Sequence, residues 1–294
     1  MPPQKEHSQQ LKRVFLIGSN ISKSISPAFQ NKAFKKTGFR ARYELLQFPE
    51  SRFESFVDEM KHSKDVLGFN VTAPYKEMIL PFISKTDASS SAIGSVNTVK
   101  ILRSGVMNGY NTDLHGILES FSKLGLKKKD RAVVLGAGGA ARACVYASLK
   151  FGIRSVAILN RSKNRAEGVR AHFLKLFPRA KIEISPLTSE DIANETRSAD
   201  ILINAVTNPF PIETDFAGAS RSLKFFDLGY REQSSILARA RRARIDSIDG
   251  LLMLVEQGAR SFEIWTSLKA PRQPMLLAAR RELLKPTREP FLSL

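Results

Sequence analysis

A chain of 294 residues, 43% of them apolar, can bury more than one core, and we expect two domains. The formal net charge of +18 would suit a nucleic acid or a small anion, whereas the polar first ten residues and the lack of any run of roughly 20 apolar residues argue against export and a membrane partner. One cysteine and four histidines without metal-ligand spacing exclude an internal disulfide and favour metal-free chemistry in a soluble, cytoplasmic protein.

The first third of the chain alternates apolar runs rich in β-branched residues with longer helical patterns, which is typical of an α/β fold with parallel sheets. Strands are predicted at residues 14–17, 43–48, 68–72 and 96–102. Helices are predicted to begin at Pro27, Pro49 and Pro74, because proline suits the first helical turn. A further helix is predicted over residues 113–124.

A basic linker at residues 127–130 precedes an apolar strand, 131–135, which runs into a glycine-rich turn and marks a second domain. Later strands are predicted at residues 156–159, 182–184, 201–205 and 225–228, with a short one near 245, and two helices over 250–284. The densest basic run, 239–244, is predicted to lie in a surface helix. Because it has no interleaved aromatic residues, a solvated basic face is favoured over a nucleic-acid site.

The glycine-rich turn follows a predicted strand and opens a predicted helix; its residues are Gly136, Ala137, Gly138, Gly139 and Ala140. Glycine lets such a turn tighten and lets the backbone approach a pyrophosphate, whose charge is met by N–H groups at the helix start. A tight turn without a ligand is the alternative. The flanking strand and helix favour dinucleotide binding.

The next predicted strand ends at Asn160, which is followed by Arg161, Ser162 and Arg165. An NAD site usually has an acidic residue here for the ribose 2′-hydroxyl, whereas arginine suits a 2′-phosphate. Because no acid is present, the sequence favours NADP. Arg161 and Arg165 can flank the phosphate, while Ser162 can offer a hydroxyl or serve as an ordinary helix cap.

Lys76 follows Pro74 at a predicted helix start, where the helix dipole disfavours a cation. That position suits a lysine that must give up a proton during catalysis. An exposed lysine compensated by Glu77 is an equally good interpretation of the segment alone.

Five other polar or reactive positions have plain structural interpretations. Ser26 and the Thr112-Asp113 pair can cap helix starts, and Asn97 can be a turn residue. Cys144 lies in an apolar helical stretch and is predicted to be a small buried core residue.

In combination and in their order along the chain, these segments resemble the shikimate dehydrogenase family. The matching segments are 24–27 (SISP), 70–76 (NVTAPYK), 93–98 (IGSVNT), 111–113 (NTD), the glycine turn, 160–162 (NRS) and 249–257 (DGLLMLVEQ). The resemblance implies an α/β protein whose N-terminal substrate domain, 1–112, is completed by C-terminal helices, 246–294. A Rossmann-type, doubly wound cofactor domain, 113–245, would be inserted between them, with the active site in the cleft.

The resemblance also implies reversible NADPH-dependent reduction of 3-dehydroshikimate to shikimate, with Lys76 as general acid and base and Asp113 as its partner. The substrate carboxylate would be held by Ser24, Ser26 and Tyr230, and the ring hydroxyls by Thr72, Asn97 and Gln257. The positions expected to bind NADP are Gly136, Ala137, Gly138, Gly139, Ala140, Asn160, Arg161, Ser162, Arg165 and Gly250. Closure of the cleft is expected before hydride transfer.

Four positions depart from the family pattern. Lys23 and Gln30 stand where histidines are common, which would alter the rim of the site. Val206 takes a threonine position on the nicotinamide side, and Glu232 replaces a proline after Tyr230.

Several alternatives stay open. A quinate/shikimate dehydrogenase of broader range uses the same chemistry, since one ring hydroxyl is accommodated by small pocket changes. A non-catalytic NADP-binding regulator is an alternative of another class, against which Lys76 and Asp113 argue. We expect a monomer or homodimer whose partners are small molecules and not nucleic acid.

Overall fold

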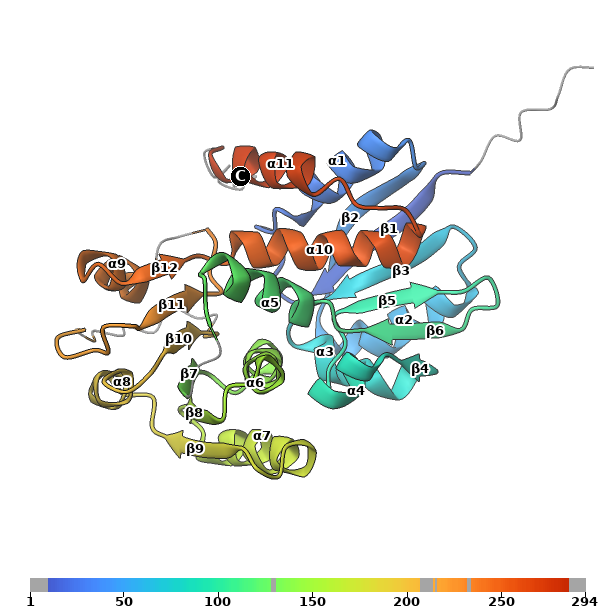
Figure 1. Cartoon of the computed structure of the whole chain (residues 1–294). Helices are drawn as coiled ribbons and strands as arrows, with labels where there is room; N and C mark the ends of the chain where they lie inside the picture. Colours follow the sequence, from blue (N-terminus) through green and yellow to red (C-terminus); the bar gives the residue numbers. More distant parts are fainter. Residues whose placement is uncertain (1–9, 128–130, 207–213, 215, 232–233, 286–294) are drawn as a thin grey trace, which may run out of the picture.

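A computed structural model of the chain describes residues 10–127, 131–206, 214, 216–231 and 234–285, and it contains two six-stranded sheets (Figure 1). The first sheet has the spatial order β2 (Ala41–Gln47), β1 (Lys12–Gly18), β3 (Val66–Val71), β5 (Thr98–Ile101), β6 (Met107–Tyr110) and β4 (Lys85–Thr86). The helical elements of this part are α1 (Ser26–Thr37), η1 (Glu50–Arg52), α2 (Phe53–His62), α3 (Tyr75–Met78), η2 (Leu80–Phe82) and α4 (Ala88–Ile93).

This first sheet is mixed, so the expectation of a parallel sheet is wrong for this half of the chain. Strands β1, β2 and β3 are parallel, but β5 runs antiparallel to both β3 and β6. The reason is the connection between β5 and β6, which is a short hairpin closed by the bond from Leu102 N–H to the Val106 carbonyl. A parallel pair would need a crossover of a dozen residues or more.

The second sheet is entirely parallel, with the order β12 (Asp246–Ile248), β11 (Lys224–Asp227), β10 (Ile201–Asn204), β7 (Arg131–Leu135), β8 (Ser155–Leu159) and β9 (Lys181–Ser185). Its helices are α6 (Gly139–Phe151), α7 (Lys163–Leu176), α8 (Ser189–Thr196) and α9 (Ser235–Arg242). The strand order reverses between β7 and β10, which confirms the predicted doubly wound, Rossmann-type arrangement. The sheet continues to Ile248, beyond the expected end of the cofactor domain at 245.

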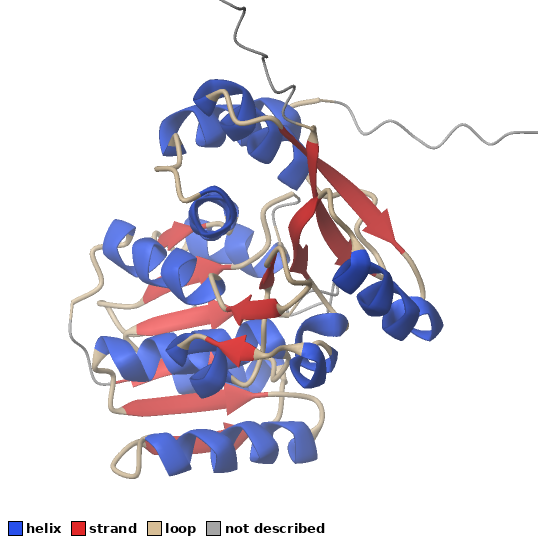
Figure 2. Cartoon of the chain, turned by 90° about the vertical axis from the view of Figure 1, so that its right-hand side faces the viewer, coloured by secondary structure: helices blue, strands red, loops and turns tan. Residues whose placement is uncertain are grey.

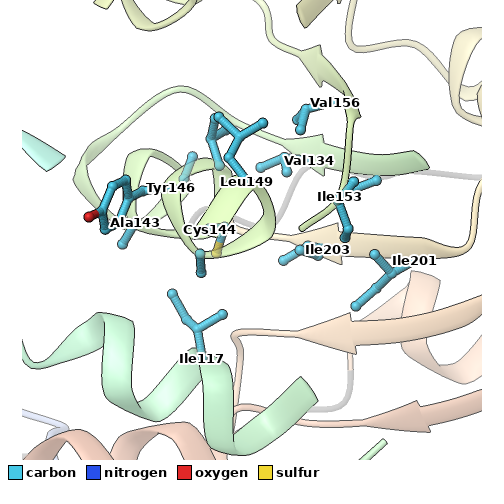
Figure 3. Close-up of a cluster of buried hydrophobic side chains, with 14 of the residues drawn as sticks. Ile117, Val134, Ala143, Cys144, Tyr146, Leu149, Ile153, Val156, Ile201 and Ile203 are labelled. Carbon is cyan, nitrogen blue, oxygen red and sulfur yellow. The ribbon is translucent and has the colours of Figure 1, made fainter. Parts of the chain in front are cut away.

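Buried strands explain why the second sheet could be predicted from apolar runs. Helices cover both faces of a parallel sheet, so its strands carry apolar residues on both sides. In β7, Val134 belongs to the core under α6 and Val133 to the core on the other face. Figure 3 shows Cys144 of α6 facing Ile117 within the first of these cores. Cys144 is buried, which confirms its prediction as a core residue, and this burial raises the pKa of its thiol.

The remaining helices are α5 (Asp113–Lys123), α10 (Leu251–Thr266) and α11 (Arg272–Leu283). The two halves of the molecule are joined through α5, which packs on both α6 and α10. In Figure 1, α10 runs between α5 on one side and α1 and α11 on the other, and all these pairs are in contact. Phe29 of α1 and Phe262 of α10 share one core with Met275 of α11. Burying each such side chain contributes about 1.5–3 kcal/mol.

The last described helix, α11, is therefore packed against the first, α1. In the view of Figure 2 the two sheets occupy different parts of the molecule, each with helices beside its strands. Among the described residues, none of the helices has the length and apolar character required to span a bilayer.

Candidate active site

A cavity with a volume of about 310 Å³ opens where the first sheet, the glycine turn and α10 meet. All the residues predicted to act on substrate line it: Ser24, Ser26, Thr72, Lys76, Asn97, Asp113, Tyr230 and Gln257. They come from both halves of the chain and from α10. Of the residues predicted to bind NADP, the cavity is lined by Ala140 and Gly250.

Lys76 and Asp113 form an ion pair within this cavity. The Lys76 Nζ lies 2.7 Å from Asp113 Oδ2, and the two side chains are 15% and 7% exposed. The interpretation of Lys76 as an exposed lysine compensated by Glu77 is therefore wrong. The dipole argument does not hold either, because α3 begins after Pro74 and is only one turn long, too short for many peptide dipoles to add.

The neighbour of Lys76 anchors this short helix. Tyr75 is fully buried, and its ring stacks on those of Phe53 and Phe48 at centroid distances of 4.8 and 5.3 Å. Its hydroxyl donates a 2.6 Å hydrogen bond to the Phe48 carbonyl. Because Tyr75 is held on one side of the turn, the backbone that carries Lys76 is fixed beside the cavity.

Asn97 holds the carboxylate partner in place and is not a turn residue. Its Nδ2 donates to Asp113 Oδ1 at 2.8 Å, and its Oδ1 accepts from the Thr112 N–H at 2.8 Å. Thr112 is the N-cap of α5, but neither it nor Asp113 makes a side-chain capping bond, so the capping prediction is wrong for both. Their polar groups point instead into a buried network.

Ser26 is likewise not a helix cap, since α1 already begins at Ser26 and has no side-chain capping bond. Its hydroxyl accepts a hydrogen bond from Ser24 Oγ at 3.2 Å. Tyr230 interacts with Ser24 from the other side, and burial raises the pKa of Tyr230, so its hydroxyl stays protonated. The cavity thus has one end made of three hydroxyl groups.

Two residues of this region were not assigned a role from the sequence. Tyr43 and Asn70 line the cavity, and the Tyr43 hydroxyl donates to Asn70 Oδ1 at 2.8 Å. Asn70 Nδ2 donates in turn to the hydroxyl oxygens of Thr98 and Ser261, at 2.9 and 3.1 Å. Asn70 could have been found from its position two residues before Thr72 on the same strand face. Tyr43 carries no local signal, because only the sheet brings β2 near β3.

Gln257 reaches this network from α10, far along the chain. Its Oε1 lies 3.4 Å from Asn97 Nδ2 and 3.3 Å from Thr112 Oγ1, while its own Nε2 donates to the Leu254 carbonyl at 2.7 Å. The contact with Asn97 is long for a hydrogen bond and can be exchanged for a better one.

The glycine turn lies at the point where the strand order of the second sheet reverses. Gly136 has φ +105°, and a side chain there would contact Ala205 and Val206 after β10. Gly138 is the N-cap of α6, has open space around its Cα, and no side chain caps this helix. A ligand phosphate can therefore approach the first N–H groups of α6, which is where open α/β sheets bind nucleotides.

The glycine turn also touches the ion pair. A Cβ at Gly139 would lie 3.4 Å from Lys76 Cδ, so the lysine side chain passes directly over the turn. Gly250 has a different role. A Cβ at this position would lie 2.0 Å from the Leu228 carbonyl oxygen, so no side chain fits there. Gly250 is thus required by the backbone contact between α10 and the end of β11.

The arginine-bearing segment lies outside the cavity, at the carboxyl end of β8. Arg161 and Arg165 are exposed, and Ser162 caps α7 by accepting from the Arg165 N–H. Asn160 Nδ2 donates to the Ser162 carbonyl at 2.8 Å and shapes the turn. Because β8 is next to β7, this segment can meet the far end of a nucleotide whose pyrophosphate lies on the glycine turn. The donors fit a 2′-phosphate.

Comparisons with known proteins agree with this geometry. Family models match residues 16–99 as shikimate dehydrogenase substrate binding domain, 119–229 as shikimate / quinate 5-dehydrogenase and 250–280 as shikimate 5′-dehydrogenase C-terminal domain. The NADP(+)-dependent shikimate dehydrogenase of Caldicellulosiruptor saccharolyticus is 33% identical over 94% of this chain and 99% of its own length. The chain belongs to the shikimate dehydrogenase family.

Other family members are similarly related. The NADP(+)-dependent shikimate dehydrogenase of Methanopyrus kandleri is 35% identical over 89% of this chain and 92% of its own length. The crystal structure of shikimate 5-dehydrogenase from Thermus thermophilus in complex with NADP(H) and shikimate matches with a TM-score of 0.80. That pair is 29% identical, over 92% of this chain and 99% of the other.

The departures from the shikimate dehydrogenase family pattern have different structural consequences. Lys23 lines the cavity, as expected for a rim residue. Gln30 does not, so the expectation for it is wrong: it is fully buried on α1 and donates to the Gly258 carbonyl at 2.9 Å. Val206 packs near Gly136, beside the glycine turn. Glu232 lies outside the described residues.

Among the residues that the structure describes, no three histidine, cysteine or acidic side chains are placed together to hold a metal ion.

Proposed function

We propose that this protein catalyses the reversible, NADP(H)-dependent reduction of 3-dehydroshikimate to shikimate. The observation that carries this proposal is the Lys76–Asp113 ion pair, which lies inside the cavity with the lysine side chain over Gly139 of the nucleotide turn. Such an arrangement puts a proton donor where a ketone can lie beside a nicotinamide. The shikimate dehydrogenase relatives carry the same activity and cofactor in their names.

Reduction of a ketone needs a proton at the oxygen as negative charge develops there. Bound NADPH supplies the hydride. Lys76 would donate the proton to the carbonyl oxygen, and Asp113 would orient the ammonium group and stabilise it between turnovers. In the reverse direction the neutral Lys76 amine would take the proton from the ring hydroxyl.

The substrate carboxylate would lie at the hydroxyl end of the cavity, with Ser24, Ser26 and Tyr230 as donors. The ring hydroxyls would meet Thr72, Asn97 and Gln257 near the ion pair. The 3.4 Å contact between Asn97 and Gln257 supports this assignment, because both groups can replace a weak mutual bond with one to a ring hydroxyl. Asn97 would also position Asp113.

The pyrophosphate of NADP would bind the turn of Gly136, Ala137, Gly138, Gly139 and Ala140, and its 2′-phosphate would meet Arg161, Ser162 and Arg165. Asn160 would act by shaping that turn through its bond to Ser162. Gly250 would act through the close approach of α10 to Leu228, next to the cavity, and not through a donor of its own.

We also propose the division into a substrate domain, 1–112 with 246–294, and a cofactor domain, 113–245, that close on each other during turnover. The location of the cavity between them supports this division. We expect a cytoplasmic enzyme that is a monomer or homodimer. Sedimentation velocity measures the oligomeric state.

One set of assays with the purified chain tests the function. We expect NADPH oxidation with 3-dehydroshikimate and NADP⁺ reduction with shikimate, with kcat/KM for shikimate above that for quinate and with NADP⁺ preferred to NAD⁺. Equal or better turnover of quinate would identify a quinate/shikimate dehydrogenase. No turnover of either acid, with NADPH still bound in a fluorescence titration, would identify a regulator and overturn the proposal.

A further inference from the structure

Two cations line the cavity in addition to the reacting pair. Among the lining residues of the described chain, the charged ones are Lys23, Lys76, Asp113 and Arg231. Lys76 and Asp113 neutralise each other at 2.7 Å. Lys23 and Arg231 have no carboxylate partner within the part of the chain that the structure describes, so they add positive charge to the cavity.

Both cations lie at the hydroxyl end. Lys23 directly precedes Ser24, and Arg231 directly follows Tyr230. The Arg231 side chain interacts with the Tyr230 hydroxyl, which also interacts with Ser24. Arg231 therefore lies beside the Tyr230 hydroxyl, which is itself proposed to bind the substrate carboxylate. Lys23 and Arg231 are exposed as well as lining, which places them at the mouth of the cavity.

A carboxylate in this cavity would need charge compensation. The hydroxyls of Ser24, Ser26 and Tyr230 are neutral donors, and a carboxylate taken out of water is costly unless a cation pairs with it. The Lys76 ammonium cannot fill this role, since it is already paired with Asp113. The guanidinium at position 231, which has no carboxylate partner among the described residues, can, and its fork of N–H groups matches the two oxygens of a carboxylate.

We propose that Arg231, assisted by Lys23, is a specificity-determining residue that recognises the substrate's carboxylate by pairing with its negative charge. The proposal deepens the proposed function and rests on it. Arg231 has the larger effect because its planar donors can bind in a bidentate way, whereas Lys23 acts as an exposed point charge. The chain would thus select ring acids over their neutral analogues by ion pairing in addition to hydroxyl contacts.

A comparison of charged and neutral substrates tests this. The wild type, Arg231→Gln, Arg231→Lys and Lys23→Gln are assayed with NADP⁺ and either shikimate or shikimamide, the neutral amide of the same ring. For Arg231→Gln we expect kcat/KM for shikimate to fall about 10-fold, mainly through KM, with little change for the amide. Arg231→Lys should recover part of the loss, and Lys23→Gln should lose about 3-fold.

A matched control removes the same charge elsewhere. Arg103→Gln takes one exposed arginine from the β5–β6 turn, away from the cavity lining, and should leave the ratio of acid to amide unchanged. An equal loss for acid and amide in Arg231→Gln would mean that Arg231 only supports the structure. An unchanged acid-to-amide ratio would also overturn the proposal.

Failure of the proposed function would be visible separately, as a wild type that turns over no ring acid. Calorimetric titration with cyclohexene-1-carboxylate and its amide then decides the inference without turnover. Tighter binding of the acid that is lost in Arg231→Gln supports charge recognition at this site. Equal affinity of the wild type for acid and amide contradicts it.

Discussion

Several polar side chains in the cavity or beside it give up an ordinary structural role. Ser26, Thr112 and Asp113 all stand at helix starts, where they could cap free N–H groups, yet none of them does so. A helix cap contributes about 1 kcal/mol, so leaving these caps unmade has a cost. Ser26 instead accepts a hydrogen bond from Ser24, Asp113 accepts from Lys76 and Asn97, and Thr112 donates to Asn97. These bonds hold polar groups in and beside the cavity, as a binding site requires.

Lys76→Ala tests the residue that is proposed to donate the proton. We expect NADPH affinity to stay nearly unchanged and turnover of 3-dehydroshikimate to fall roughly 100-fold or more, the usual effect of losing a general acid. Steady-state rates and a fluorescence titration of NADPH measure the two effects. Lys85→Ala, in the exposed edge strand β4, is the matched control and should retain full turnover. Wild-type turnover in Lys76→Ala would show that another group is the acid.

Arg161→Ala tests the preference for the phosphorylated cofactor. Because the exposed guanidinium is proposed to pair with the 2′-phosphate, which NADH lacks, we expect KM for NADPH to rise about 10-fold while KM for NADH stays the same. The measurement is the ratio of kcat/KM for the two cofactors. Arg179→Ala, another exposed arginine, should leave this ratio unchanged. A parallel loss with NADH would contradict the assignment.

At the scale of elements, an ion-pair cluster ties α11 to α10. Arg272 on α11 donates from Nε to Glu256 at 2.9 Å and from a terminal nitrogen to Glu263 at 2.8 Å. His115 of α5 contacts Glu256 from the other side at 3.6 Å. Contact with His115 lowers the pKa of Glu256. Burial opposes this shift, but Arg272 also lowers the pKa, and the net pKa is lowered. Burial by itself would raise the pKa of Glu263. The hydrogen bond from Arg272 and further donors outweigh burial, so the pKa of Glu263 is lowered.

Arg272→Gln should therefore change acid stability. A carboxyl whose pKa is lowered in the folded state adds stability that is present above its unfolded pKa, about 4.3, and is lost as pH falls through the lower folded pKa. At pH 7 we expect the variant to be roughly 1 kcal/mol less stable, given the partial exposure of the cluster. Urea unfolding at pH 7 and pH 3 should show this difference shrinking at the lower pH. A difference independent of pH would contradict the ion-pair explanation.

At the scale of the whole molecule, α10 connects the parts that must cooperate. It packs on α5 and α1, lines the cavity through Met253, Leu254 and Gln257, and begins at the close contact of Gly250 with Leu228. A ligand that binds the second sheet and a ligand that binds the first therefore share one helix. We infer that the two halves unfold together.

Thermal unfolding with and without cofactor tests this coupling. NADPH at about 100 times its Kd should stabilise the folded state by about 2.7 kcal/mol, which raises Tm by roughly 2–4 °C per kcal/mol. If α10 couples the halves, calorimetry should show one transition that moves as a whole. NADH at the same concentration should shift it less. Two transitions, of which NADPH moves only one, would show that the halves unfold separately.

Local sequence determined much of this protein. The apolar strands of the second sheet, the glycine turn and the residue types of the reacting pair could all be read from short segments, because each depends on neighbours a few positions away. The family resemblance rests on the same short segments and their order. Only their order along the chain linked them before the fold was known.

The tertiary structure alone decided which groups are partners. Asn97 meets Gln257 across 160 positions, Tyr43 meets Asn70 through the order of the strands, and Arg231 comes to the hydroxyl end of the cavity from the second sheet. The antiparallel course of β5 and β6 and the unused helix caps are further examples. The type of a side chain determines which hydrogen bonds it can make. The packing of distant segments determines which donor or acceptor lies within reach of it.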